Sequence, residues 1–207
     1  MIISMTTSME NGSEVQTTSN QNQDILPSHL GGHLNKTHND RGALQYLMNT
    51  FNIKSFLDIG CGPGGMVELA QLRGLRAVGI DGDWQVEKCR DTNIIIHDFN
   101  EGPLPIRLGD FDLGWSVEFL EHVEEKYQDF YMDSFKLCRY VVITAAPPGW
   151  AGHHHVNCQP STYWIEVFDK HGFDYREDIT QQIKQHSTMQ KGFINLTGLF
   201  FERRDTI

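Results

Sequence analysis

Two groups of residues have the types and spacing of a chemical site. Glu118, Glu121 and His122 stand at positions i, i+3 and i+4, which share one face if the segment is helical. That face would carry two carboxylates and an imidazole, a plausible ligand set for a divalent metal ion. A second group, residues 153–155, is a run of three histidines in a later loop. The two groups together predict a catalytic or metal-binding site.

The histidine run follows residues 140–144, whose β-branched pattern is typical of a central parallel strand. Adjacent side chains alternate along an extended chain, so the three histidines cannot all reach one ion. We take the central residue, His154, as a fourth ligand beside Glu118, Glu121 and His122, or as a general base with a pKa near neutrality. The pattern leaves open which of the three faces the site, and a plain surface loop is the alternative.

A ligand-binding loop is indicated by residues 56–65. An apolar, strand-like run ends in four glycines within six residues, and Met66, Leu69 and Ala70 then fall on one helical face. Glycines let the backbone pass close to a ligand, and the free N–H groups of the following helix attract a polar or anionic group. Strand, glycine loop and helix in this order predict a nucleoside-containing cofactor.

Two cofactor classes compete for the loop. Gly60, Gly62 and Gly65 fit the dinucleotide pattern G-x-G-x-x-G, with Asp81 about twenty residues further on to bind ribose hydroxyls. Asp58, two residues before the first glycine, suits a ligand that carries an ammonium group and suits a pyrophosphate poorly. S-adenosylmethionine has such a group, so Asp58 favours it over a nicotinamide dinucleotide.

The loop resembles motif I of the class I S-adenosylmethionine-dependent methyltransferases, D-x-G-x-G-x-G, with Asp58, Gly60, Gly62 and Gly64 in the matching places. The resemblance extends over about residues 41–203. It implies an α/β, Rossmann-like fold with a doubly wound, seven-stranded, mostly parallel sheet whose last strand is antiparallel. A dinucleotide oxidoreductase stays open as an alternative.

The resemblance also implies roles for the ends of successive strands. Asp98 would contact the adenine amino group, and Phe99 would pack on the ring. Trp115 and Ser116 would approach the methionine and sulfonium end, and Asp81 would bind the ribose. The cofactor-binding residues expected are Asp58, Gly60, Cys61, Gly62, Gly64, Asp81, Asp98, Phe99, Trp115 and Ser116.

Residues 118–122, E-x-x-E-H, resemble the segment with which two methyltransferase groups hold a divalent ion. These are the O-methyltransferases of ubiquinone synthesis and the enzymes that methylate the terminal 2′-hydroxyl of small RNAs. Metal-free relatives carry a similar L-E-H-V, whose histidine is structural or contacts the substrate. We expect methyl transfer to a small hydroxylated molecule, with Glu121, His122 and His154 as base or ligands. Alternatives are a metal-dependent RNA 2′-O-methyltransferase and a noncatalytic S-adenosylmethionine-binding partner protein.

Composition limits the partners. The chain has 207 residues, 39% hydrophobic, which suffices for one domain with a sizeable core. A formal charge of −10 disfavours long nucleic acids, so a small-molecule acceptor is expected. The cysteines form no C-x-x-C pair, which indicates reduced thiols and a cytoplasmic location. No run approaches membrane-spanning length, so no membrane association is expected. The cysteines are Cys61, Cys89, Cys138 and Cys158.

The domain is expected to cover residues 26–207. Residues 1–25 are polar and predict a flexible tail. Residues 26–40 mix histidines, glycines and a lysine without periodicity; they predict a surface loop or, by the same resemblance, a lid over the cofactor, with Lys36 and Thr37 as its candidate contacts. Further elements expected are helices at about 41–50 (capped by Asn39 or Asp40), 64–73, 84–90, 124–137 and from Ser161 as cap, a helix or excursion at 178–190, and strands at 77–80, 93–96, 111–115, from 173, and 193–201.

Overall fold

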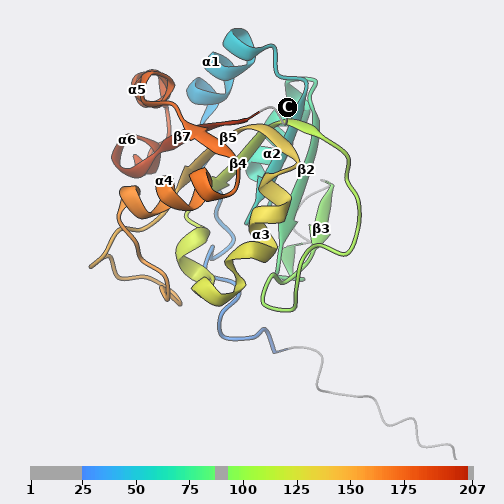
Figure 1. The fold of residues 1–207 in the computed structure, drawn as a ribbon. Coiled ribbons are helices and arrows are strands. Elements are labelled where there is room, and N and C mark those ends of the chain that lie inside the picture. The colour runs from blue at the N-terminus through green and yellow to red at the C-terminus, as the bar shows by residue number, and fades with distance from the viewer. Residues whose placement is uncertain (1–24, 87–92, 205–207) are drawn as a thin grey trace, which may run out of the picture.

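The computed structural model describes residues 25–86 and 93–204, and its centre is a seven-stranded sheet in the order β3-β2-β1-β4-β5-β7-β6 (Figure 1). The first five strands in this order pair in parallel, whereas β7 is antiparallel to both β5 and β6. The predicted doubly wound α/β fold is confirmed. The strands are β1 Ser55–Ile59, β2 Arg76–Asp81, β3 Ile94–Ile96, β4 Phe111–Val117, β5 Cys138–Thr144, β6 Phe173–Tyr175 and β7 Leu199–Arg203.

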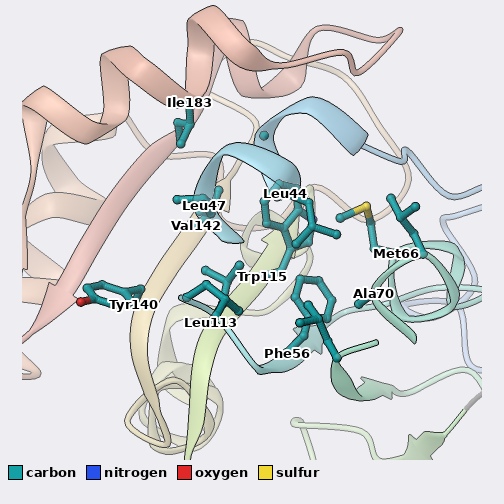
Figure 2. Close-up of a cluster of buried hydrophobic side chains, with 14 of the residues drawn as sticks. Leu44, Leu47, Phe56, Met66, Ala70, Leu113, Trp115, Tyr140, Val142 and Ile183 are labelled. Atoms are coloured by element: carbon teal, nitrogen blue, oxygen red, sulfur yellow. The ribbon is translucent and has the colours of Figure 1, made fainter. Parts of the chain in front are cut away.

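Helices cover both faces of the sheet because strand residues alternate between two hydrophobic clusters. Phe56 of β1 points into the first cluster and Leu57 into the second. Residues of α1, α2, α5 and α6 join the first cluster, part of which Figure 2 shows around Leu44 and Trp115, and residues of α3 and α4 join the second. The helices are α1 Arg41–Phe51, α2 Gly65–Leu72, α3 Gln128–Phe135, α4 Ser161–Lys170, α5 Glu177–His186 and α6 Phe193–Thr197, with 3₁₀ turns η2 Leu120–His122 and η3 Glu125–Tyr127.

The start of α1 fixes the chain that leads into it. The Asp40 carboxylate caps the helix by accepting a hydrogen bond from the Ala43 N–H at 2.9 Å, as predicted. The same buried carboxylate accepts hydrogen bonds from the Ser187 hydroxyl and from the Thr188 N–H, the latter at 2.9 Å. Asp40 therefore ties the segment before α1 to the connection between α5 and α6.

Some predicted elements differ from the observed ones. The prediction of one last strand over 193–201 is wrong: residues 193–197 form α6, and β7 begins after Gly198. The Gly198 N–H donates to the Ile194 carbonyl, and Ile194 is buried in the first cluster, so tertiary packing selects a helical turn from an apolar run that also suits a strand. Ser161 is the first residue of α4 and does not cap it.

The remaining expectations fall into two groups. The predicted helix over 124–137 is divided into η3 and α3. Residues 1–24, most of the helix expected at 84–90, and Cys89 lie outside the described residues. Within the described part, Cys61, Cys138 and Cys158 are free thiols, and no helix has the length and apolar character needed to cross a bilayer.

Candidate active site

A pocket of about 440 Å³ lies at the carboxyl ends of the parallel strands. Its volume is in the range of small-molecule and cofactor sites, and the position beside the β1/β4 switch point is where ligands of open α/β sheets bind. Predicted site residues that line it are Asp58, Gly60, Cys61, Gly62, Asp81, Asp98, Phe99, Trp115, Glu118, Glu121 and His122.

The glycine loop needs glycine for two separate reasons. Gly60 has φ +73°, and a Cβ at this position would stand 2.4 Å from the Phe119 ring. The N–H groups of Gly60 and Cys61 both donate to the Ile80 carbonyl, at 2.8 and 3.1 Å, and hold the loop against β2. Gly64, with φ +77°, serves as the N-cap of α2 and is not among the pocket-lining residues, so its part is to form the turn.

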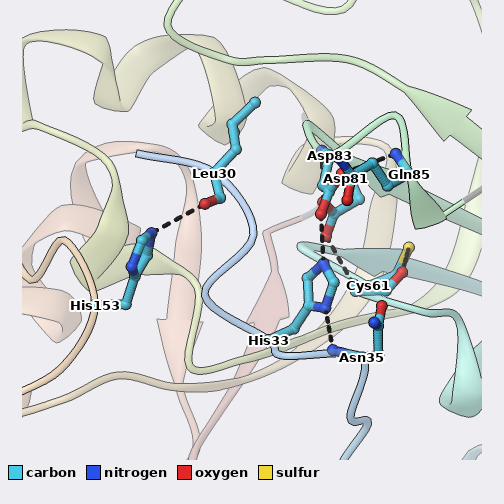
Figure 3. Close-up of polar contacts among 9 residues, drawn as sticks. Leu30, His33, Asn35, Cys61, Asp81, Asp83, Gln85 and His153 are labelled. Atoms are coloured by element: carbon cyan, nitrogen blue, oxygen red, sulfur yellow. Dashed lines mark hydrogen bonds and ion pairs between the residues drawn. The ribbon is translucent and has the colours of Figure 1, made fainter. Parts of the chain in front are cut away.

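Asp58 and Asp81 concentrate negative charge in the pocket. Asp58 is 3% exposed, and burial, followed by the neighbouring Asp81, raises its pKa well above the usual range. The Asp81 carboxylate accepts hydrogen bonds from the N–H groups of Gly62 at 2.7 Å and Asp83 at 2.9 Å, yet burial still raises its pKa (Figure 3). A positively charged ligand would relieve this repulsion.

Asp98 and Phe99, which follow β3, also line the pocket. The Asp98 carboxylate accepts a hydrogen bond from the Asn100 N–H at 2.9 Å and another from His29 Nε2 at 2.6 Å. Phe99 is buried and meets Phe119 edge to face. Both side chains stand where the sequence pattern requires, and their contacts with an adenine ring stay a prediction.

Trp115 and Ser116, neighbours on β4, have different surroundings. Trp115 lines the pocket, and its buried indole N–H has no partner among the described residues. Ser116 is fully buried, and its hydroxyl donates to the Ile59 carbonyl at 2.8 Å. The expectation that Ser116 faces the cofactor is corrected: the side chain joins β4 to the end of β1 below the pocket surface.

Glu121, His122 and His155 form the acidic and histidine cluster of the pocket, which we call the Glu–His cluster. One possible ligand atom from each lies within 4.8 Å of the others. The premise of a regular helix is wrong: Glu118 leaves β4 with φ +54°, and only the short turn η2 follows. The loop that carries His155 is held in place because the N–H groups of the next two residues, Val156 and Asn157, donate to the Glu121 carbonyl at 2.9 and 3.0 Å.

The structure brings His155, and not His154, to the cluster. His154 adopts a left-handed backbone with φ +46°; its ring lies 5.9 Å from that of the pocket-lining His29, but His154 itself is not among the pocket-lining residues. His155 Nδ1–H donates to the Trp150 carbonyl at 3.0 Å, which leaves Nε2 with a free lone pair. His155 therefore takes the place of His154 as the candidate base or ligand, because the chain turns at His154.

Burial controls the protonation of the cluster. Glu121 is 0% exposed, and neither carboxyl oxygen has a hydrogen-bond partner in the described part of the chain. Burial, followed by repulsion from Glu118, raises the pKa of Glu121 to about 8. Burial, followed by the neighbouring His155, lowers the pKa of His122 to about 4. The cluster thus combines an acid that is protonated at neutral pH with a neutral imidazole, and it can take up a cation or a proton.

Comparison with known proteins indicates the family to which part of the chain is similar. A family model described as "Methyltransferase domain" matches residues 57–137, which hold the glycine loop, the strand-end acids and Glu121. Residues 57–137 thus match the methyltransferase-domain family, which supports an S-adenosylmethionine-dependent methyltransferase. This assignment replaces the dinucleotide alternative, and no curated protein is similar enough in sequence to count as a match.

Three solved structures share the fold of this methyltransferase at low sequence identity. A TehB-like S-adenosylmethionine-dependent methyltransferase from Corynebacterium glutamicum is 17% identical, with a TM-score of 0.56 over 80% of this chain and 90% of that one. An O-methyltransferase from a Brevibacillus brevis trans-AT PKS multienzyme, bound to S-adenosylhomocysteine, is 15% identical (TM-score 0.57; 79% and 71% covered). Magnesium protoporphyrin IX methyltransferase from Synechocystis PCC 6803 is 16% identical (TM-score 0.54; 78% and 80% covered).

The segment before α1 contributes contacts that pattern analysis of the methyltransferase missed. His33 Nε2 donates to the Asp83 carboxylate at 3.0 Å, and His153 Nε2 donates to the Leu30 carbonyl at 2.9 Å (Figure 3). The Thr37 hydroxyl accepts a hydrogen bond from the Gly65 N–H at 3.1 Å. No periodicity marks these residues, and only their histidine content distinguished the segment. It touches the cofactor side and the histidine loop at once.

Proposed function

We propose that this methyltransferase transfers the methyl group of S-adenosylmethionine to a hydroxyl group of a small molecule. The observation that carries this proposal is the position of the Glu–His cluster in the same pocket as the glycine loop. A carboxyl group and two imidazoles beside the cofactor can bind and deprotonate a hydroxyl.

The proposed cofactor pose follows the charges of the pocket. Asp98 and Asp81 end β3 and β2 and would hold the adenine and ribose, which leaves the methionine part over β1 and β4. Asp58 would then pair with the ammonium group. This pose is supported by the raised pKa values of Asp58 and Asp81, because a cationic ligand stabilises both carboxylates.

The Glu–His cluster fits a divalent transition-metal ion. Glu121 offers a buried carboxyl group whose oxygens have no partner among the described residues, and His155 offers a free Nε2. His122 is neutral because burial lowers its pKa, as a ligand must be. Two imidazoles and one carboxylate are a common set for zinc and related ions. When bound, such an ion would lower the pKa of the acceptor hydroxyl and orient it.

The residues themselves can move the proton. Because its pKa is raised to about 8, Glu121 is protonated at neutral pH and becomes a carboxylate that can act as a base at mildly alkaline pH. When the acceptor oxygen attacks the methyl carbon and the carbon–sulfur bond breaks, the hydroxyl proton would pass to Glu121 in its ionised form, and S-adenosylhomocysteine with an uncharged sulfur would leave. His122, with a pKa of about 4, is a poor proton acceptor and instead positions the acceptor or a ligand ion.

Residues 26–40 would act as a lid in this proposal. His29 and His33 bind the carboxylates of Asp98 and Asp83, and the Leu30 carbonyl accepts a hydrogen bond from His153. These contacts join the two sides of the pocket across its opening. Closing the lid would exclude water from the methyl transfer, which strengthens the electrostatic interactions inside.

A small acceptor is favoured over RNA by charge. The chain carries a formal charge of −10, and among the described residues that line the pocket the only lysines or arginines are Lys36 and Lys191. Binding of an RNA strand needs a continuous basic groove for its phosphates. The similar structures from Brevibacillus brevis and Synechocystis are an O-methyltransferase and a magnesium protoporphyrin IX methyltransferase, which agrees with a small-molecule acceptor.

Labelled cofactor offered with a panel of hydroxylated metabolites and short RNAs tests the proposal. We expect label in a hydroxylated small molecule, and mass spectrometry of the product should locate the methyl group on oxygen. Transfer to nitrogen or carbon alone, or to RNA alone, would overturn the proposed acceptor class. Whether a metal ion is bound and needed is tested separately, by metal analysis of the purified protein and by activity assays with and without a chelator. If no ion is bound and activity under chelation is full, Glu121 would act as the base without a metal.

A further inference from the structure

The side of the pocket opposite the Glu–His cluster carries positive charge. Lys36 and His38 of the segment before α1 line the pocket together with Lys191 and Phe193, which come from the start of α6 and the residues before it. The two segments are in contact, because the His38 ring meets the Phe193 ring edge to face at 5.0 Å. Three nitrogen-bearing side chains thus gather where two distant parts of the chain meet.

Within residues 25–86 and 93–204, no carboxylate neutralises the charges of this group. Among the described residues, neither Lys36 nor Lys191 has a carboxylate in ion-pair contact. Burial first, then Lys191 and Lys36, lowers the pKa of His38, so the imidazole is neutral and close to both ammonium groups. Like charges held together at the edge of a pocket favour an anionic ligand.

The fold places this group at one end of the proposed cofactor pose. The Thr37 hydroxyl, between the two lining residues Lys36 and His38, binds the Gly65 N–H at the start of α2. Helix α6 packs against β5, whereas Asp81 and Asp98 follow β2 and β3, on the other side of β1 and β4. The lysines therefore lie away from the adenine end and close to the glycine loop.

A further polar group on this face also lacks a partner. Trp115 belongs to the hydrophobic cluster under α1 and α6, lines the pocket, and has a buried indole N–H without an acceptor among the described residues. A buried donor of this kind is stabilised when a ligand supplies an oxygen. It is an independent indication that an acceptor-rich group binds on the lysine side.

We propose that Lys36 and Lys191 bind the carboxylate of the cofactor's methionine moiety. The inference rests on the proposed cofactor pose, in which Asp58 holds the ammonium group of the same moiety. The α5–α6 excursion between β6 and β7, which carries Lys191, then takes part in cofactor recognition. Because Ser187 and Thr188 bind Asp40 at the start of α1, the excursion and the lid segment form the carboxylate site together.

Two forms of the cofactor that differ only in this carboxylate provide the test. Calorimetry would compare S-adenosylmethionine with decarboxylated S-adenosylmethionine on the full chain and on Lys191→Met and Lys36→Met. We expect each substitution to weaken S-adenosylmethionine by about fivefold to tenfold, since an exposed charge-assisted contact is lost, and to leave the decarboxylated form unchanged. Lys170→Met, at an exposed position outside the pocket, is the matched control and should change neither affinity.

The outcomes separate this inference from the proposed function. Equal weakening of both ligands, or no weakening of either, would overturn the carboxylate site while leaving S-adenosylmethionine binding established. Unchanged cofactor affinities together with a raised KM for an anionic acceptor would assign the lysines to the acceptor and would also overturn it. Failure of the unmodified chain to bind S-adenosylmethionine would refute the cofactor pose itself.

Discussion

The glycine loop with its strand-end acids and the Glu–His cluster share one pocket but are built differently. The loop follows β1 directly, and Asp81 accepts a hydrogen bond from Gly62 of the adjacent strand's loop. The Glu–His cluster joins η2 to the loop after β5 through the Val156 and Asn157 N–H groups. The first region is built from regular strands and short loops. The second is built from two irregular segments, η2 and the loop after β5, that are joined by hydrogen bonds.

This difference predicts that substitutions in the Glu–His cluster lower the catalytic rate without weakening cofactor binding. Replacing Glu121 by Gln or His155 by Ala should lower kcat by about 10²-fold to 10³-fold, because the base or the ligand set is lost. The affinity for S-adenosylhomocysteine should stay within about twofold, since neither residue belongs to the proposed cofactor contacts. Steady-state kinetics and calorimetry measure the two quantities.

His154→Ala is the matched control for His155→Ala. It removes an adjacent imidazole from the same loop, but one that packs near His29 outside the pocket lining. We expect its kcat to remain close to that of the unmodified enzyme. A loss at His154 as large as at His155 would mean that the loop as a whole, and not the Nε2 of His155, supports catalysis.

Gly60→Ala tests the cofactor side. A Cβ there would meet the Phe119 ring at 2.4 Å, and φ is +73°, so we expect about 3 kcal/mol less stability and at least tenfold weaker cofactor binding. Gly74→Ala is the control: its φ is +81°, but nothing lies within 4 Å of the added carbon, so only strain of about 1 kcal/mol should appear. Chemical denaturation and calorimetry distinguish the two; equal effects would refute a special role for the Phe119 contact.

The contrast between the two regions also explains what the sequence could predict. Glycines, apolar runs and strand-end acids are local signals, so the sheet and the positions of Asp58, Asp81 and Asp98 follow from them. Trp115 and Ser116 are consecutive residues of β4, so their side chains point in opposite directions. Which of the two faces the pocket depends on how β4 packs beside β1. The choice between His154 and His155 depends on backbone turns that no residue type requires.

The N-terminal segment shows the same limit. The resemblance to methyltransferases suggested a lid, but pairing of His29 with Asp98 and of His33 with Asp83 joins residues far apart in the chain. Lys191 gave no signal at all, because it lies between the expected excursion at 178–190 and the expected strand at 193–201. Contacts of this kind arise from the packing of α6 and the Asp40 hydrogen bonds, which are tertiary features.

Asp58→Asn should change how cofactor binding depends on pH. Burial raises the pKa of Asp58, so part of the Asp58 carboxyl group is protonated at acidic pH when no cofactor is bound. Pairing with the cofactor ammonium favours the ionised carboxylate. Affinity should therefore rise with pH as Asp58 ionises and then level off. The asparagine variant should bind about tenfold more weakly at pH 7 and lose this pH dependence. Calorimetry between pH 5 and 7, about the range in which the ammonium keeps its charge, measures both; an unchanged profile would exclude the pairing.

Ser116→Ala is expected to have the smallest effect and to test the boundary between the regions. The buried hydroxyl donates to the Ile59 carbonyl at 2.8 Å, so its loss should cost about 1 kcal/mol of stability. Cofactor affinity should remain unchanged, because the side chain lies below the pocket surface and not on it. If S-adenosylmethionine binding weakened severalfold while stability stayed constant, Ser116 would be a cofactor contact after all, and β4 would have to present both Trp115 and Ser116 to the ligand.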